Sequence, residues 1–196
     1  MRSQTKLSKS DRTRSAILQA AREIFAREGY ERATVRDIAA AAGIDAAMVI
    51  RYYGSKEALF ALSAEFDLRL PDPEKIDPGR LGETLVRHFL SIWEGEDAVS
   101  GLSVMLRSAS SNEFAAAKLH DVFSGQVLPM LSRIGNPADA HDRAGLVASQ
   151  LIGLAFARYV IKLPPVVGLP TDLIVREIGR TLQEYLLGGR RAESDS

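Results

Sequence analysis

No cysteine occurs among the 196 residues of this chain, which excludes disulfide bonds and thiolate metal sites and favours a reducing compartment. Histidine is also rare: His88, His120 and His141 lie on separate segments, without the close spacing that a metal site needs. The chain contains neither a Gly-x-Ser-x-Gly nucleophile elbow nor a glycine-rich loop for phosphates. These absences argue against an enzyme, and we expect no metal ion and no cofactor.

The chain also lacks a long uninterrupted apolar run. Its longest apolar stretch extends from about Leu146 to Ile161, contains Arg158 and is followed by Pro164. A membrane-spanning helix needs about 20 apolar residues, so we expect this stretch to form a buried helix. The first ten residues are polar and lack the apolar segment of a signal peptide. We therefore expect a cytoplasmic protein with no membrane partner.

Positive and negative charges balance to a net charge of zero but are unevenly distributed. Residues 1–60 contain 11 Lys and Arg against 7 Asp and Glu, whereas residues 61–196 contain 14 against 18. A basic N-terminal part on a mildly acidic body is typical of a protein whose N-terminal part binds phosphates. The first residues, including Arg2, Lys6 and Lys9, form either a solvated tail or an arm that reaches DNA.

Apolar side chains recur at helical spacing along most of the chain, and no segment alternates convincingly as a strand. The first helix is predicted from Arg12 to Glu28 and ends at Gly29. On its polar side, Glu23 and Arg27 lie four residues apart and are predicted to pair.

A domain boundary is predicted where Pro71 and Pro73 interrupt the helical pattern, which gives domains at 11–71 and 72–188. Pro129 should distort its helix near Gly125, because its ring crowds the carbonyl group four residues earlier. The helices predicted beyond the boundary are 78–94, 99–109, 113–134, 137–162 and 171–187.

Two short helices joined by a glycine turn are predicted between residues 34 and 53. Thr34 followed by Asp37 forms a capping box, which begins the first of these helices. Gly43 supplies the left-handed residue of the turn, and Asp45 caps the second helix. This arrangement is a helix-turn-helix, whose second helix can enter the major groove of DNA.

A third helix is predicted to begin after Ser55, with Leu59, Leu62 and Phe66 on its buried face. Around the helix-turn-helix, small residues allow close approach to bases, apolar residues can touch thymine methyl groups, and cationic or hydroxyl groups can meet phosphates. The predicted DNA-binding residues are Thr34, Arg36, Ala46, Ala47, Met48, Ile50, Arg51, Tyr52 and Lys56.

The segments TVRDIAAAAGID, at 34–45, and VIRYYGSKEALF, at 49–60, resemble the DNA-binding domain of the tetracycline-repressor (TetR) family. The resemblance covers about residues 11–71. It implies an all-α fold, in which an N-terminal three-helix helix-turn-helix domain precedes a C-terminal helical domain for ligand binding and dimerisation. It also implies that Tyr53 docks the recognition helix and that Tyr52 and Lys56 contact phosphates.

The chain departs from the family pattern at the recognition helix. Ile50 stands where the family usually has a tyrosine that touches DNA, and Ala47 and Met48 stand where Gly or Thr is common. The contact at Ile50 is therefore expected to be apolar, and no known operator sequence can be transferred. The run at 49–56 and the Ala-Arg-Tyr-Val segment at 157–160 further resemble a subgroup of the family from actinobacteria.

The resemblance implies a ligand-responsive regulator, most often a repressor, that binds a near-palindromic double-stranded DNA operator as a homodimer and releases it when an unknown small-molecule effector binds. The predicted dimer interface lies on the last two helices at Gly145, Ser149, Gly153, Ala157, Ile174, Ile178, Leu182 and Tyr185. The candidate residues of the ligand pocket are His88, Trp93, Met105, Arg107, Phe114, His120, Phe123, Gln126 and Tyr159.

Other interpretations of the same residues stay open. The short helix pair could be merely structural, the last two helices could pack only within one subunit, and an activator is as compatible with the sequence as a repressor. The alternative function is a helical small-molecule carrier or adaptor that has lost DNA binding, which only the Ile50 departure favours. Steep salt dependence of duplex binding would separate the regulator from the carrier.

Overall fold

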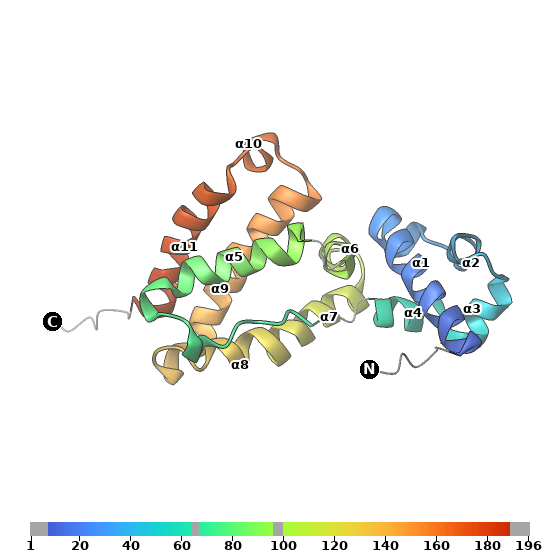
Figure 1. The fold of residues 1–196 in the computed structure, drawn as a ribbon, viewed down its shortest axis with the longest axis horizontal. Coiled ribbons are helices and arrows are strands. Elements are labelled where there is room, and N and C mark those ends of the chain that lie inside the picture. The colour runs from blue at the N-terminus through green and yellow to red at the C-terminus, as the bar shows by residue number, and fades with distance from the viewer. Residues whose placement is uncertain (1–7, 64–66, 96–99, 189–196) are drawn as a thin grey trace, which may run out of the picture. The chain divides into compact units, whose positions relative to one another are not determined.

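The computed structural model describes residues 8–63, 67–95 and 100–188, and these form two compact units (Figure 1). Every regular element in these ranges is helical, which confirms the predicted all-α class. Residues 8–63 and 100–118 make up the N-terminal unit, and residues 67–95 and 119–188 make up the C-terminal unit. The packing therefore differs from the linear division predicted at Pro71, because the segment 100–118 packs with the N-terminal unit.

The N-terminal unit is built around the long helix α1, against which α2, α4 and α6 pack. Its core holds Ile17, Phe25, Ile38, Leu59 and Phe60, all fully buried. The helices of this unit are α1 (Lys9–Arg32), α2 (Val35–Ala42), α3 (Ala46–Tyr53), α4 (Lys56–Ser63), α6 (Ser100–Ser108) and the greater part of α7 (Glu113–Val122).

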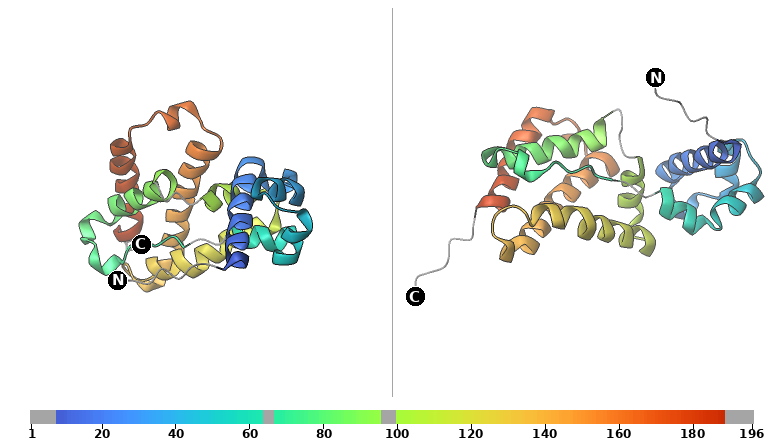
Figure 2. Two further views of the ribbon diagram at one scale, coloured as in Figure 1. Left: turned by 45° about the vertical axis from the view of Figure 1, so that its right-hand side comes forward. Right: turned by 60° about the horizontal axis from the view of Figure 1, so that its bottom comes forward.

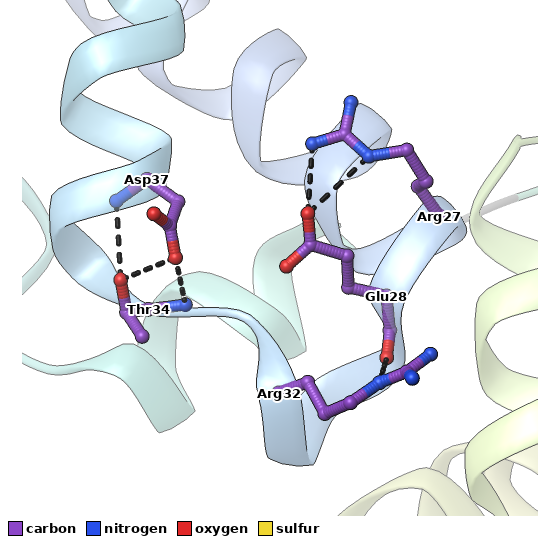
Figure 3. Close-up of polar contacts among 5 residues, drawn as sticks. All are labelled: Arg27, Glu28, Arg32, Thr34 and Asp37. Atoms are coloured by element: carbon purple, nitrogen blue, oxygen red, sulfur yellow. Dashed lines mark hydrogen bonds and ion pairs between the residues drawn. The ribbon is translucent and has the colours of Figure 1, made fainter.

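Helix α1 begins earlier than predicted and resumes for a short stretch after Gly29. It begins at Lys9, because Ser8 forms a capping box with Asp11. Regular helix stops at Gly29 as predicted, because this residue is non-helical with φ 77° and ψ 171°, and a short helical stretch to Arg32 follows the kink. The predicted Glu23–Arg27 pair is not formed: Arg27 instead pairs with Glu28, 2.8 Å away (Figure 3).

The start of α4 follows the prediction, but its buried face does not. The Ser55 hydroxyl accepts a hydrogen bond from the Ala58 amide, as expected of a cap. Leu59 is buried as predicted, whereas Leu62 is 39% exposed and Phe60 takes the buried position. Phe66 lies outside the described residues, as do Arg2 and Lys6 of the N-terminal arm.

The C-terminal unit consists of α5 packed along α11, with α9 beside α11 and α8 beside α9 (Figures 1 and 2). Its elements are η1 (Pro73–Lys75), η2 (Pro78–Arg80), α5 (Leu81–Glu94), η3 (Phe123–Val127), α8 (Leu128–Leu131), η4 (Pro137–Asp139), α9 (Ala140–Ala155), η5 (Phe156–Val160), α10 (Pro164–Val167) and α11 (Thr171–Leu187).

Two glycines allow α5 and α11 to come into backbone contact. A Cβ atom added to Gly82 would lie 2.0 Å from the Gly179 carbonyl oxygen, and one added to Gly179 would lie 3.0 Å from the Cα atom of Glu83. Gln183 supports the crossing, because its side chain accepts from the Gly82 amide at 2.9 Å and donates to the Pro78 carbonyl at 2.7 Å. The start of α5 is thereby capped by a residue of α11.

Both long helical predictions in this half are interrupted by π-helical segments. The distortion predicted near Gly125 takes the form of η3, which ends directly before the short helix that contains Pro129. The helix predicted at 137–162 consists of η4, α9 and η5, and the chain turns at Lys162, which has a φ of 57°. The predicted helix at 171–187 coincides with α11.

Candidate nucleic-acid interface

The first helix of the helix-turn-helix is held at its start by the predicted capping box (Figure 3). The Asp37 amide donates to the Thr34 hydroxyl at 3.1 Å, and the Thr34 amide donates to the Asp37 carboxylate at 3.2 Å. Two otherwise unpaired backbone donors are satisfied in this way, which fixes where α2 begins. Thr34 and Arg36 both remain exposed at this end of α2.

The turn between α2 and α3 has the predicted left-handed residue. Gly43 has φ 67° and ψ 35°, and its amide donates to carbonyl groups at the end of α2. Ile44 packs against the core of the unit, and the Asp45 carboxylate accepts from the Ala47 amide at 2.7 Å to cap α3. Gly54, with φ 81°, ends α3. The structure thus confirms a helix-turn-helix at residues 34–53.

Helix α3 presents one face to the core and the opposite face to solvent. Val49 is 1% exposed and anchors the helix, whereas Ile50 is 43% exposed. Ala47 and Arg51 are also exposed, and Ala46 and Met48 are half-buried. A recognition helix needs such an outer face free of contacts within its own domain. The predicted base-reading residues lie on or beside this face.

The two tyrosines at the end of α3 fasten it to the first part of α1. The Tyr53 hydroxyl donates to the Arg14 carbonyl at 2.8 Å, and the Arg14 guanidinium lies 5.5 Å from the centre of the Tyr52 ring. Tyr53 therefore docks α3, as the resemblance implied. The sequence did not indicate this contact of Arg14 with Tyr52, a predicted phosphate contact.

At the start of α4, Lys56 and Glu57 both contact Tyr30 of α1. The Lys56 ammonium lies 4.3 Å from the centre of the Tyr30 ring, and the Tyr30 hydroxyl donates to Glu57 Oε1 at 2.8 Å. Burial, followed by this hydrogen bond, raises the pKa of Tyr30 to about 12. Hydrogen bonds from its own backbone amide, from Tyr30 and from Ser55 lower the pKa of Glu57. No local sequence pattern marked Tyr30 or Glu57 as part of this site.

The sequence matches two family descriptions over separate parts of its length. Residues 17–62 match "Bacterial regulatory proteins, tetR family", and residues 79–186 match "Tetracyclin repressor-like, C-terminal domain". The second match alone spans more than half of the chain. The chain belongs to the TetR family.

Several solved structures of regulators resemble the chain over nearly their full lengths. A TetR-family regulator from Streptomyces coelicolor A3 is 32% identical, with a TM-score of 0.58, and the match covers 94% of this chain and 99% of that one. NalD, the secondary repressor of the MexAB-OprM multidrug efflux pump in Pseudomonas aeruginosa, is 20% identical, with a TM-score of 0.66 and coverage of 91% and 97%. The fatty acid degradation regulator FadR from Bacillus halodurans is 18% identical, with a TM-score of 0.67 and coverage of 95% and 99%. No curated protein matches the chain in sequence.

This TetR-family protein is a DNA-binding transcriptional regulator and belongs to a family without enzymatic activity. The family binds DNA operators, responds to ligands and is typically dimeric. Within the described ranges, no helix is long and apolar enough to cross a membrane.

The residues predicted for a ligand pocket fall into different groups in the structure. Met105, which is fully buried, Arg107 and Phe114 belong to the N-terminal unit, and the others belong to the C-terminal unit. Phe114 is 56% exposed, so its ring faces solvent rather than an enclosed pocket. His120 is exposed as well, and Phe123 packs against the C-terminal core.

Two of these candidates hold the same stretch of backbone. His88 Nε2 lies 2.8 Å from the Leu68 carbonyl oxygen, and Gln126 Oε1 accepts from the Leu68 amide at 2.8 Å. His88 and Gln126 therefore hold the segment that leads into α5, a structural role that the sequence did not indicate.

Trp93 and Tyr159 form the one aromatic contact between predicted pocket residues in the described part of the chain. Their rings stack 4.7 Å apart at an angle of 4°, with Phe89 at one side. The Tyr159 hydroxyl donates to Glu94 at 2.7 Å, and Arg158 donates to the same carboxylate at 2.9 Å. Burial, followed by the bond to Glu94, raises the pKa of Tyr159.

The residues predicted for the dimer interface also separate into two groups. Gly145, Ser149 and Gly153 are exposed along one face of α9. By contrast, Ile174 and Leu182 are 2% and 0% exposed and belong to the subunit core, because their side of α11 packs within the C-terminal unit. In this structure they contribute to the subunit's own fold. The other predicted interface residues, Ala157, Ile178 and Tyr185, are half-buried.

Proposed function

We propose that this protein is a dimeric, ligand-responsive repressor that binds a near-palindromic operator through α3. The observation that carries the proposal is the exposed outer face of α3 within a helix-turn-helix of the TetR family. Ile50 and Ala47 lie on that face for contacts with thymine methyl groups and base edges, and Arg51 lies there for a phosphate. Such a regulator would act on DNA in the cytoplasm.

Two further groups of residues are proposed to contact the phosphate backbone. Thr34 and Arg36 lie at the start of α2, where backbone amides and the helix dipole favour an anion. Lys56 at the start of α4 and Tyr52 at the end of α3 are held by Tyr30 and Arg14. Phosphate contacts of this kind position a recognition helix without reading sequence.

The proposed dimer forms through the exposed face of α9. Apolar side chains lie along this face beside the small residues: Leu146, Ile152 and Phe156 are 46%, 47% and 41% exposed. Nothing lies within 4 Å of a Cβ atom added to Gly145 or Gly153, so a second helix can approach closely there. A two-fold dimer would present two recognition helices to half-sites about 34–36 Å apart.

The effector is proposed to bind beside the stacked pair of Trp93 and Tyr159. Aromatic walls with a few polar groups are typical of small-molecule sites. Trp93 Nε1 is buried and has no hydrogen-bond partner among the described residues, so it can donate to an acceptor on a ligand. Since Trp93 is the only tryptophan in the chain, its fluorescence would report binding there.

Repression is proposed by analogy with the structurally similar NalD, which is a secondary repressor. The proposed mechanism is a population shift, in which effector binding favours a dimer whose recognition helices no longer fit the operator.

Selection of bound duplexes from a random DNA pool, at near-physiological salt, tests the proposal. We expect enrichment of an inverted repeat, and an affinity that falls steeply with salt. Arg51→Ala and Lys56→Ala should each reduce the slope of log affinity against log salt by about one, because each removes one phosphate contact. A folded dimer that enriches no sequence would contradict the proposal and favour the carrier alternative.

A further inference from the structure

The contacts of Tyr30 connect α1, on which it lies, with α4 and α6 of the N-terminal unit. Its ring packs against Phe60, with centroids 4.9 Å apart, and lies 6.2 Å from Phe25, so its orientation is fixed by the core. Its backbone amide donates to the hydroxyl of Ser108 on α6 at 3.5 Å. The ring face and the hydroxyl group both remain available to α4.

These two available groups act on neighbouring residues of opposite charge. The ring face attracts the Lys56 ammonium, and the hydroxyl hydrogen is donated to the Glu57 carboxylate. Without that hydroxyl, the Glu57 carboxylate would lose a partner while lying one residue from Lys56. It could then pair with the lysine or repel an approaching phosphate, and either outcome weakens a phosphate contact at the start of α4.

We propose that Tyr30 is a positioning residue for operator binding, which holds Lys56 ready for a DNA phosphate and keeps Glu57 away from it. The inference rests on the proposed function, because it requires that Lys56 contacts the operator. Tyr30 lies outside the helix-turn-helix, and it would influence operator binding through the side chains of Lys56 and Glu57 on α4. This role of Tyr30 also explains why an acidic residue is tolerated directly after the phosphate-binding lysine.

Tyr30→Phe tests the proposal because it keeps the ring in the core and removes only the hydroxyl group. Operator affinity of the full-length protein should fall about three- to tenfold, the size expected when one charged contact is lost. The slope of log affinity against log salt should become shallower by up to about one, because fewer phosphates are neutralised. Thermal unfolding of the variant, measured in parallel, shows whether the fold is retained.

A second substitution distinguishes positioning from a general structural role. Glu57→Gln in the Tyr30→Phe background should restore affinity, because the released carboxylate is no longer charged. Glu31→Gln is the matched control: it removes the same charge one residue from Tyr30, from a side chain that does not accept the hydroxyl, and should not restore affinity. If Tyr30→Phe lowers stability, the comparison of the two double variants still separates the two roles.

Three results would overturn the inference. Tyr30→Phe could bind the operator as tightly as the wild type, Glu31→Gln could restore affinity as well as Glu57→Gln, or Glu57→Gln could strengthen binding as much in the wild type as in the Tyr30→Phe background. Each of these leaves the proposed function intact, because the wild type still binds its operator. Failure of the wild type to bind any duplex would overturn the proposed function, and the inference with it.

Discussion

At the scale of single residues, the sharpest prediction about the helix-turn-helix concerns Gly43. It has a positive φ, and no atom lies within 4 Å of a Cβ atom built on it, so a substitution there changes only the backbone energy. A β-branched side chain tolerates this conformation poorly. Gly43→Val should therefore destabilise the N-terminal unit by about 2 kcal/mol in urea unfolding and abolish operator binding.

Gly43→Asn is the matched control for this substitution. Asparagine adopts the left-handed conformation more readily than other residues with a side chain, so this variant should stay close to the wild type in stability and in DNA affinity. Native stability of Gly43→Val would mean that the turn of the helix-turn-helix does not depend on Gly43.

Residues that act on their near neighbours in the chain could be predicted from the sequence. The Thr34–Asp37 box and the turn at Gly43 were, because a cap or a turn needs partners only three or four residues away. Tyr30 and Glu57 are separated by 27 residues, and no local pattern shows that such a pair meets. The contact of Arg14 with Tyr52 was missed for the same reason.

At the scale of helices, the crossing of α5 and α11 depends on Gly82. Gly82→Ala would place a methyl group 2.0 Å from the Gly179 carbonyl oxygen, so the two helices would have to move apart. Because backbone cannot rotate away as a side chain can, we expect destabilisation of about 1–3 kcal/mol or more, measured by urea unfolding. The Gln183 cap of the α5 start would be displaced together with the crossing.

Gly125→Ala provides the comparison for this experiment. Gly125 lies in η3, and nothing is within 4 Å of a Cβ atom built on it. The same added methyl group should be neutral there or should stabilise by up to about 1 kcal/mol through the unfolded state. If the two substitutions changed the stability equally, the close approach of the helices at Gly82 would not be the cause of the destabilisation.

The number and order of the main helices could be predicted from periodicity, whereas their packing partners could not. The distortion at η3 was expected only because Pro129 follows it. Apolar spacing does not distinguish an α-helix from one that contains a π-helical turn, so η5 was expected as continuous helix. The membership of 100–118 in the N-terminal unit depends on contacts with α1, which are distant in sequence.

At the scale of the whole molecule, the sequence alone could not separate a core face from an interface face. Ile174 and Leu182 have the spacing of a dimer helix, but the same spacing suits packing against α5, and the structure buries them there. Small residues at 145, 149 and 153 lie on an exposed face instead. The proposed interface is therefore narrower than the sequence indicated and is centred on α9.

Ile152→Glu tests whether this face of α9 joins two subunits. Ile152 is 47% exposed in the subunit, so a glutamate there is tolerated by the monomer but would place two charges in the apolar interface of a dimer. Light scattering should show a monomer, and affinity for the inverted repeat should fall by about 10²- to 10⁴-fold, toward that of one half-site, because the two recognition helices are no longer linked. Val167→Glu, which changes an apolar side chain on α10 with 46% exposure, should remain a dimer and retain operator affinity. If Ile152→Glu is folded and still dimeric, the subunits associate through another surface, and the spacing of the two half-sites would have to be derived from that surface.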